Sequence, residues 1–189
     1  LKATEMKKLF FVIYLLSLTF AQSQNGKLSP MFYKDKREVF REKMPENSVA
    51  VLFSAPIRNR ANDVDYVFHQ DPNFFYLTGW HQPHSVLMIY KNPQVDELGS
   101  FNEKIYILER DEYKELWNGK RYSVEAVKKL GFERVNTRNH FMNDISNLST
   151  YDKVLMFGFN NDIRNQEDDP FDLFDLKAAF KKAINFPSS

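Results

Sequence analysis

Short apolar runs alternate along the chain with segments of mixed polarity. The runs are six or seven residues long and are nearly continuous, with little alternation of apolar and polar positions. A strand that is covered on both faces has this pattern, whereas a half-exposed strand alternates. The pattern therefore predicts four buried strands, at residues 48–54, 85–91, 104–109 and 152–157.

Helical periodicity lies between these runs. Tyr33–Met44 places apolar side chains at helical spacing among charged ones, and Pro45 follows to end the helix. Another candidate helix has Ser123 as its N-cap and Gly131 just past its end. In addition to the helix at 33–44, the pattern predicts helices at residues 111–117, 123–130, 137–148 and 170–183. This order of elements predicts an α/β fold in which helices flank a mixed β-sheet.

The first thirty residues have a different character. After Met6, two lysines precede an apolar run over residues 9–20, and the small residues Ala21 and Ser23 follow. This is the form of a secretory signal peptide, and the run is shorter than the roughly 20 residues of a membrane span. We expect upstream residues and a signal peptide at 1–23 and a flexible lead-in at 24–30. The product is then secreted to the periplasm or the extracellular space, without a stable membrane anchor.

Composition narrows the classes of function. The 26 Lys and Arg residues balance 25 Asp and Glu residues, so no net field attracts nucleic acid, and we expect no nucleic-acid partner. The chain has no cysteine, which removes thiol catalysis, and its 6 glycines form no phosphate-binding motif. A length of 189 residues accommodates one sizeable domain, and 43% apolar residues supply its core without disulfides.

Candidate catalytic side chains are few and lack partners. His81 and His84 have a spacing that two metal ligands can adopt, but no carboxylate lies close to them in sequence. We therefore interpret them as surface or turn histidines, and we expect a turn or backbone-bonding role for residues 69–71. The remaining acids of interest form two pairs that we expect to be solvated in loops, at positions 63 and 65 and at positions 168 and 169.

Residues 68–80, FHQDPNFFYLTGW, concentrate aromatic rings and then stop them at Thr78 and Gly79. The rings either form the floor of a ligand groove or belong to a buried strand with its turn. Gly79 supplies a backbone angle that other residues avoid, and we expect it to end that strand. Most of the rings should lie in the core, with one or two facing outward.

An ordered series of segments connects this aromatic stretch to a known family. They are RNRANDVDY at 58–66, QDPNFFYLTGW at 70–80, ERD at 109–111, ELWNGKR at 115–121 and LGF at 130–132. Over residues 30–160 the series resembles the N-terminal domain of the Xaa-Pro aminopeptidases, or aminopeptidase P. Together with the leader, it is most similar to secreted bacterial members. The resemblance implies a domain of the creatinase/aminopeptidase P N-terminal type at 31–160.

The resemblance also implies where the chemistry takes place. In this family, a following domain of the pita-bread fold holds two Mn²⁺ ions through Asp, His and Glu side chains, and the ions activate water. No stretch here supplies that ligand set, and Ser189 stands about where the second domain would begin. We expect residues 161–189 to be a polar loop and a helix that lead to a missing catalytic domain. This chain would then be a fragment or truncated product, with no metal and no activity of its own.

Partners and site residues follow from the same resemblance. The expected partners are the protein's own C-terminal catalytic domain, further copies in a dimer or tetramer, and proline-containing peptides. Phe75 lies where relatives can offer Trp, and Arg121 ends the Glu-x-Trp-x-Gly-x-Arg segment. As substrate-binding residues, they would face a proline ring and a peptide carboxylate. Alternatively, Phe75 packs under a helix and Arg121 pairs with Glu115 or Glu125.

Two other classes of function stay open. A free-standing secreted module would bind a sugar or peptide through exposed aromatic side chains, namely Trp80, Trp117 and Tyr122. A small hydrolase would instead be built on the acids at positions 63 and 65 together with His69. The peptidase module ranks above the binding module, and both rank above the hydrolase.

Overall fold

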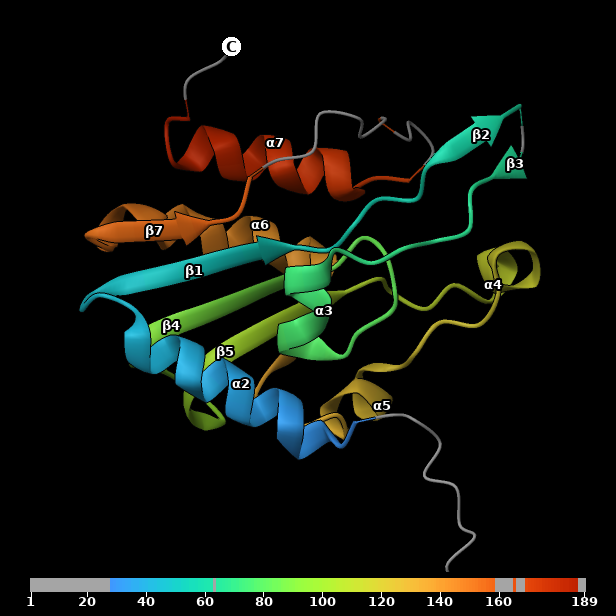
Figure 1. The fold of residues 1–189 in the computed structure, drawn as a ribbon. Coiled ribbons are helices and arrows are strands. Elements are labelled where there is room, and N and C mark those ends of the chain that lie inside the picture. The colour runs from blue at the N-terminus through green and yellow to red at the C-terminus, as the bar shows by residue number, and fades with distance from the viewer. Residues whose placement is uncertain (1–27, 63, 159–164, 166–168, 187–189) are drawn as a thin grey trace, which may run out of the picture.

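The computed structural model describes residues 28–62, 64–158, 165 and 169–186 (Figure 1). The expected signal peptide and most of the expected lead-in lie outside these residues, as do Asp63 and Asp168. Within the described ranges, no helix combines the length and the hydropathy that a membrane crossing requires.

A five-stranded mixed sheet lies at the centre of the domain, in the order β6-β5-β4-β1-β7. Both β1–β4 and β4–β5 are antiparallel, whereas β1–β7 and β5–β6 are parallel. A separate hairpin, β2 Asn59–Ala61 and β3 Val64–Asp65, projects from one end (Figure 1). The sheet strands are β1 Ser48–Phe53, β4 Val86–Asp96, β5 Gly99–Ile107, β6 Val135–Thr137 and β7 Lys153–Met156. The four predicted strands are confirmed, and β6 is an addition of only three residues.

Helices cover both faces of the sheet (Figure 1). One face carries α2 Pro30–Lys43, α3 Pro72–Thr78 and α5 Val124–Lys128. The other carries α6 Phe141–Asp144, the 3-10 helix η2 Ile145–Thr150 and α7 Leu173–Ala183. Helix α4 Glu112–Asn118 lies apart from both layers, and the 3-10 helix η1 Arg138–His140 precedes α6. The prediction of a mixed sheet flanked by helices is confirmed.

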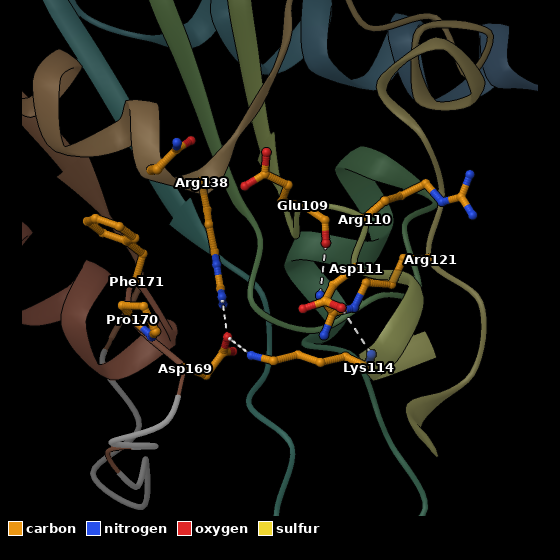
Figure 2. Close-up of a pocket in the computed structure, with 10 residues that line it drawn as sticks. Glu109, Arg110, Asp111, Lys114, Arg121, Arg138, Asp169, Pro170 and Phe171 are labelled. Carbon is orange, nitrogen blue, oxygen red and sulfur yellow. Dashed lines mark hydrogen bonds and ion pairs between the residues drawn. The ribbon is translucent and has the colours of Figure 1, made fainter. Parts of the chain in front are cut away.

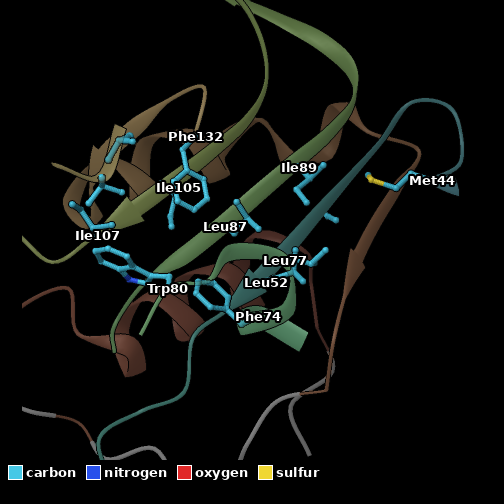
Figure 3. Packing of buried hydrophobic residues seen from close by; sticks show 13 residues of the cluster. Met44, Leu52, Phe74, Leu77, Trp80, Leu87, Ile89, Ile105, Ile107 and Phe132 are labelled. Atoms are coloured by element: carbon cyan, nitrogen blue, oxygen red, sulfur yellow. The ribbon is translucent and has the colours of Figure 1, made fainter. Parts of the chain in front are cut away.

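Both faces of the central strands are buried in apolar clusters. Along β1, Ala50 and Leu52 join the cluster beneath α2 and α3, which Figure 3 shows. Val49 and Val51 point to the opposite face and join the cluster beneath α6 and α7. Successive side chains of a strand point to opposite faces, so a strand covered twice is apolar at every position. Burial of the central strands on both faces is therefore the cause of the continuous apolar runs in the sequence.

The aromatic stretch forms a helix, so the prediction of a strand there is wrong. Asp71 Oδ1 accepts hydrogen bonds from the backbone N–H groups of Asn73 and Phe74, and Pro72 occupies the first turn of α3. Such a cap followed by proline is a helix start. Gly79 ends this helix in the left-handed conformation at φ 63°. A Cβ atom there would lie 2.4 Å from the ring of Tyr33, so glycine is also required by close packing.

The segment expected as one helix at 137–148 is divided into η1, α6 and η2. Short polar side chains of α6 and η2 bond to nearby backbone carbonyls. Ser146 Oγ donates to the carbonyl of Asn143, and Thr150 Oγ1 donates to that of Asn147. Bonds of this type compete with the regular helical pattern and favour tighter turns.

One buried ion pair fastens the α2 layer to the sheet. Arg37, on α2, is 1% exposed, and its guanidinium donates from Nε and Nη2 to the two carboxylate oxygens of Glu103 on β5. Its remaining bonds go to the carbonyls of Leu77 and Gly131, at 3.0 Å and 2.9 Å. The guanidinium carbon Cζ lies over the Phe132 ring, 4.4 Å from its centre. Arg37 thus joins α2 to α3, β5 and the turn after α5.

Candidate functional site

Two hollows lie on either side of the segment that follows α4. The first is an apolar hollow of about 360 Å³, with aromatic side chains in its wall. Phe75 is half-buried in this wall, and its ring centre lies 6.1 Å from that of Tyr33 and 4.3 Å from that of His81. Tyr122 also lines this hollow. Phe75 therefore both packs against α2 and faces an open space.

Of the aromatic side chains proposed for a free-standing binding module, Trp80 and Tyr122 both line the apolar hollow, with 5.3 Å between their ring centres, and Trp117 does not line it. Trp80 is buried, contrary to prediction, and its Nε1 donates to Ser85 Oγ at 2.8 Å. Its position just after the Gly79 cap turns it inward against the sheet. Trp117 and Tyr122 are exposed, as expected, at 79% and 49%.

The second, charged hollow has a volume of about 300 Å³ and contains Arg121 (Figure 2). Nη1 of Arg121 donates to the backbone carbonyl of Glu109 at 2.8 Å. The carboxylate of Glu115 is instead held by Arg110, through two hydrogen bonds of 2.9 Å and 3.0 Å. Phe75 and Arg121 thus line different hollows, and the structure does not bring the two side chains together.

Asp169 stands in the charged hollow between two cations. Its Oδ1 accepts from Lys114 Nζ at 2.9 Å and from Arg138 Nη2 at 2.7 Å (Figure 2). Burial alone would raise the pKa of Asp169, but these hydrogen bonds outweigh it and lower the pKa to about 2. The prediction of a solvated loop acid is wrong here, because both partners come from segments far away in the sequence.

His84 is buried against the start of α7, and it is not the surface histidine that the sequence suggested. Its Nδ1 accepts the backbone N–H of Leu173 at 3.2 Å, which places the ring proton on Nε2. Burial, and next the positive charge of Arg138, lower the pKa of His84 to about 4, with Arg121 acting in the same direction. Asp169 and Asp172 oppose the shift. His81, in contrast, is exposed as expected.

The lowered pKa of His84 predicts a loss of stability in mild acid. Between pH 6.5 and about pH 4 the unfolded chain binds a proton at His84 that the folded chain excludes, so the free energy of unfolding falls as the pH falls. Urea unfolding at a series of pH values measures this slope. The control is His84→Asn, since Asn tolerates the positive φ of 53° and offers an acceptor to Leu173. An unchanged slope in the variant would contradict the assignment.

The described residues contain no group of three or more His, Cys, Asp or Glu side chains that fits a metal ion. His81 and His84 do not act as a pair, because one is exposed and the other is buried against α7. Gln70 takes the backbone-bonding role expected for residues 69–71. Its Oε1 accepts from Ala55 N, and its Nε2 donates to the carbonyls of Trp80 and Gln82.

The family model for the N-terminal domain of aminopeptidase P matches residues 33–156. This chain therefore belongs to the aminopeptidase P N-terminal domain family. The match includes all five strands of the central sheet.

Several curated proteins are similar to this chain over about half of its length. Xaa-Pro aminopeptidase of Haemophilus influenzae is 36% identical over 102 residues, which are 54% of this chain and 23% of the relative. Intermediate cleaving peptidase 55 of Schizosaccharomyces pombe is 35% identical over 111 residues, 57% of this chain and 22% of the relative. The matched region spans about a fifth of the length of these relatives.

Solved structures agree with this assignment. The chain is similar to aminopeptidase P of Escherichia coli with a TM-score of 0.62 and 24% identity, covering 83% of this chain and 33% of that one. This likeness establishes the fold alone. Aminopeptidase PepP of Pseudomonas aeruginosa gives a TM-score of 0.63 and 28% identity, covering 72% of this chain and 30% of that one.

Proposed function

We propose that this chain forms the N-terminal, non-catalytic domain of a secreted bacterial Xaa-Pro aminopeptidase. The observation that carries the proposal is the family match over residues 33–156, which takes in the central sheet and most of its covering helices. The curated relatives with matching segments are named as Xaa-Pro aminopeptidases and an intermediate cleaving peptidase. Secretion rests on the apolar run at residues 9–20, which lies outside the described residues.

The chemistry of the parent enzyme would take place in its catalytic domain. A pair of Mn²⁺ ions there would activate water for attack on the bond that precedes proline. The described residues of this chain present no side-chain cluster that fits such ions. The role we propose for this domain is therefore to pack against its own catalytic domain, to support a homo-oligomer, and to form part of the active-site entrance.

Phe75 and Arg121 are our candidates for contact with a peptide at that entrance. Phe75 supports the proposal because its half-buried ring borders an apolar hollow, where a proline ring can pack on an aromatic face. Arg121 supports it because, in the part of the chain that the structure describes, its side chain bonds to a backbone carbonyl and forms no ion pair with a carboxylate. A guanidinium without a carboxylate partner is suited to receive one from a peptide. The two contacts would be made from separate hollows.

The proposal predicts that the 189-residue chain does not hydrolyse peptides. A chromogenic Xaa-Pro peptide is incubated with the purified chain and added Mn²⁺, and no turnover above the metal-only rate is expected. Sequencing the gene beyond codon 189 is the matching test, and an open frame with spaced Asp, His and Glu codons is expected. Turnover that disappears in Asp65→Asn would instead favour the small hydrolase and overturn the proposal.

A free-standing binding module remains the second candidate, since Trp117 and Tyr122 are exposed. It is the weaker one, because Trp80 is 3% exposed and offers only a small part of its ring to such a surface.

A further inference from the structure

The charged hollow contains a buried donor without an acceptor. Arg138 is 7% exposed, and its Nη2 donates to Asp169, but its Nη1 has no hydrogen-bond partner among the described residues. A buried, charged N–H group that is left unpaired is costly, and native proteins nearly always supply an acceptor for it. Nη1 is closed to solvent, so an acceptor in the hollow reaches it only when the Arg138 side chain turns toward the hollow.

Four cationic side chains line the same hollow, and three of them remain when Arg110, which is paired with Glu115, is set aside. Lys114 comes from α4, Arg121 from the segment after it, and Arg138 from η1, and Figure 2 shows their side chains directed toward a common region. Among the described residues, Asp169 is the only carboxylate that bonds to any of these three side chains, and it uses a single oxygen. One carboxylate oxygen thus serves two of the three cations.

The other carboxylates of the hollow are engaged or turned away. Asp111 caps α4, and its Oδ1 accepts the backbone N–H groups of Tyr113 and Lys114. The carboxylate of Glu109 points away from Asp169 in Figure 2, while its backbone carbonyl receives Arg121. The positive charge around Asp169 is therefore not fully matched by negative charge in contact with it.

We propose that this hollow binds a small oxyanion, a phosphate or carboxylate group. Its oxygen atoms would accept from Lys114 and Arg121, and also from Arg138 Nη1 when that side chain turns toward the hollow. A volume of about 300 Å³ holds such a group together with several water molecules. Asp169 competes with the ligand, because it already places a carboxylate oxygen between Lys114 and Arg138. This inference shares Arg121 with the proposed peptide contact, but it rests on the cations of the hollow and not on the peptidase function.

Titration of the full 189-residue chain tests the proposal. Sodium phosphate, sodium acetate and sodium chloride are compared at equal ionic strength, with Tm and isothermal calorimetry as readouts. We expect saturable binding of phosphate or acetate that chloride does not reproduce, and the tighter of the two identifies the ligand class. Lys114→Gln and Arg121→Gln should each weaken that binding about tenfold. Lys120→Gln is the matched control, because Lys120 is exposed and does not line the hollow.

A gain-of-binding variant guards against simple loss of the fold. Asp169→Asn removes the competing carboxylate and leaves all three cations in place, so the same oxyanion should bind more tightly and raise the Tm further than in the unaltered chain. The proposal is overturned if phosphate and acetate act no differently from chloride. It is equally overturned if Lys114→Gln, Arg121→Gln and Asp169→Asn all bind as the unaltered chain does.

Discussion

Replacing Glu103 with glutamine is expected to lower the free energy of unfolding by about 3–5 kcal/mol. The substitution keeps the shape of the side chain but removes the negative charge that faces Arg37. Arg37 is 1% exposed and fixed by carbonyls on two other segments, so it cannot turn to solvent. A buried guanidinium would then remain without a counter-charge. Chemical denaturation of the purified chain measures the loss.

The matched control for this prediction is an exposed pair on the same helix. Lys34 and Glu38 lie one turn apart on α2 with 3.8 Å between Nζ and Oε1, and both side chains are well exposed. Glu38→Gln is expected to change the free energy of unfolding by about 0.5 kcal/mol or less. If Glu103→Gln costs as little as Glu38→Gln, the Arg37–Glu103 pair does not fasten α2 to the sheet.

Phe74→Ala is expected to cost about 3–5 kcal/mol of unfolding free energy. Phe74 is fully buried on the inner side of α3, in the cluster shared with Leu52 and Leu87, so its removal leaves a cavity between the helix and the sheet (Figure 3). Chemical denaturation, with the folded structure checked by circular dichroism, measures this cost.

Tyr76 provides the comparison for Phe74, because it is an aromatic residue on the same helix that is 53% exposed. Tyr76→Ala removes only an edge contact with Phe32, at 6.4 Å between ring centres, and should cost about 1 kcal/mol or less. Equal losses in the two variants would mean that α3 does not direct one aromatic face inward and another outward.

The sequence predicted most of the fold because the relevant signals are local. The continuous apolar runs of β1 and β4 follow directly from burial on both faces, and Ser123 caps α5 as its position suggested. A strand is the wrong prediction for the aromatic stretch. The density of rings favours a strand, but Asp71 and Pro72 together mark the start of a helix. No periodicity predicts strand β6, because it has three residues and two of them are polar.

The charged hollow could not be predicted in the same way. Asp169 meets Lys114 and Arg138 across separations of 55 and 31 residues, and no local pattern in the sequence records those distances. His84 was assigned to a turn, and its partner, the backbone N–H of Leu173, lies 89 residues further along. One local signal was available. Asp169 stands directly before Pro170 and shortly before Asp172, the N-cap of α7.

The parallel pairing of β1 with β7 has a consequence for biosynthesis. Ser48 to Val51 acquire their neighbours on one side only when residues 153–156 have been made, about a hundred positions later. During translation, that edge of β1 exposes unsatisfied backbone groups on a strongly apolar strand, which other nascent chains can pair with. The ribosome therefore has to deliver nearly the whole domain before this edge is protected.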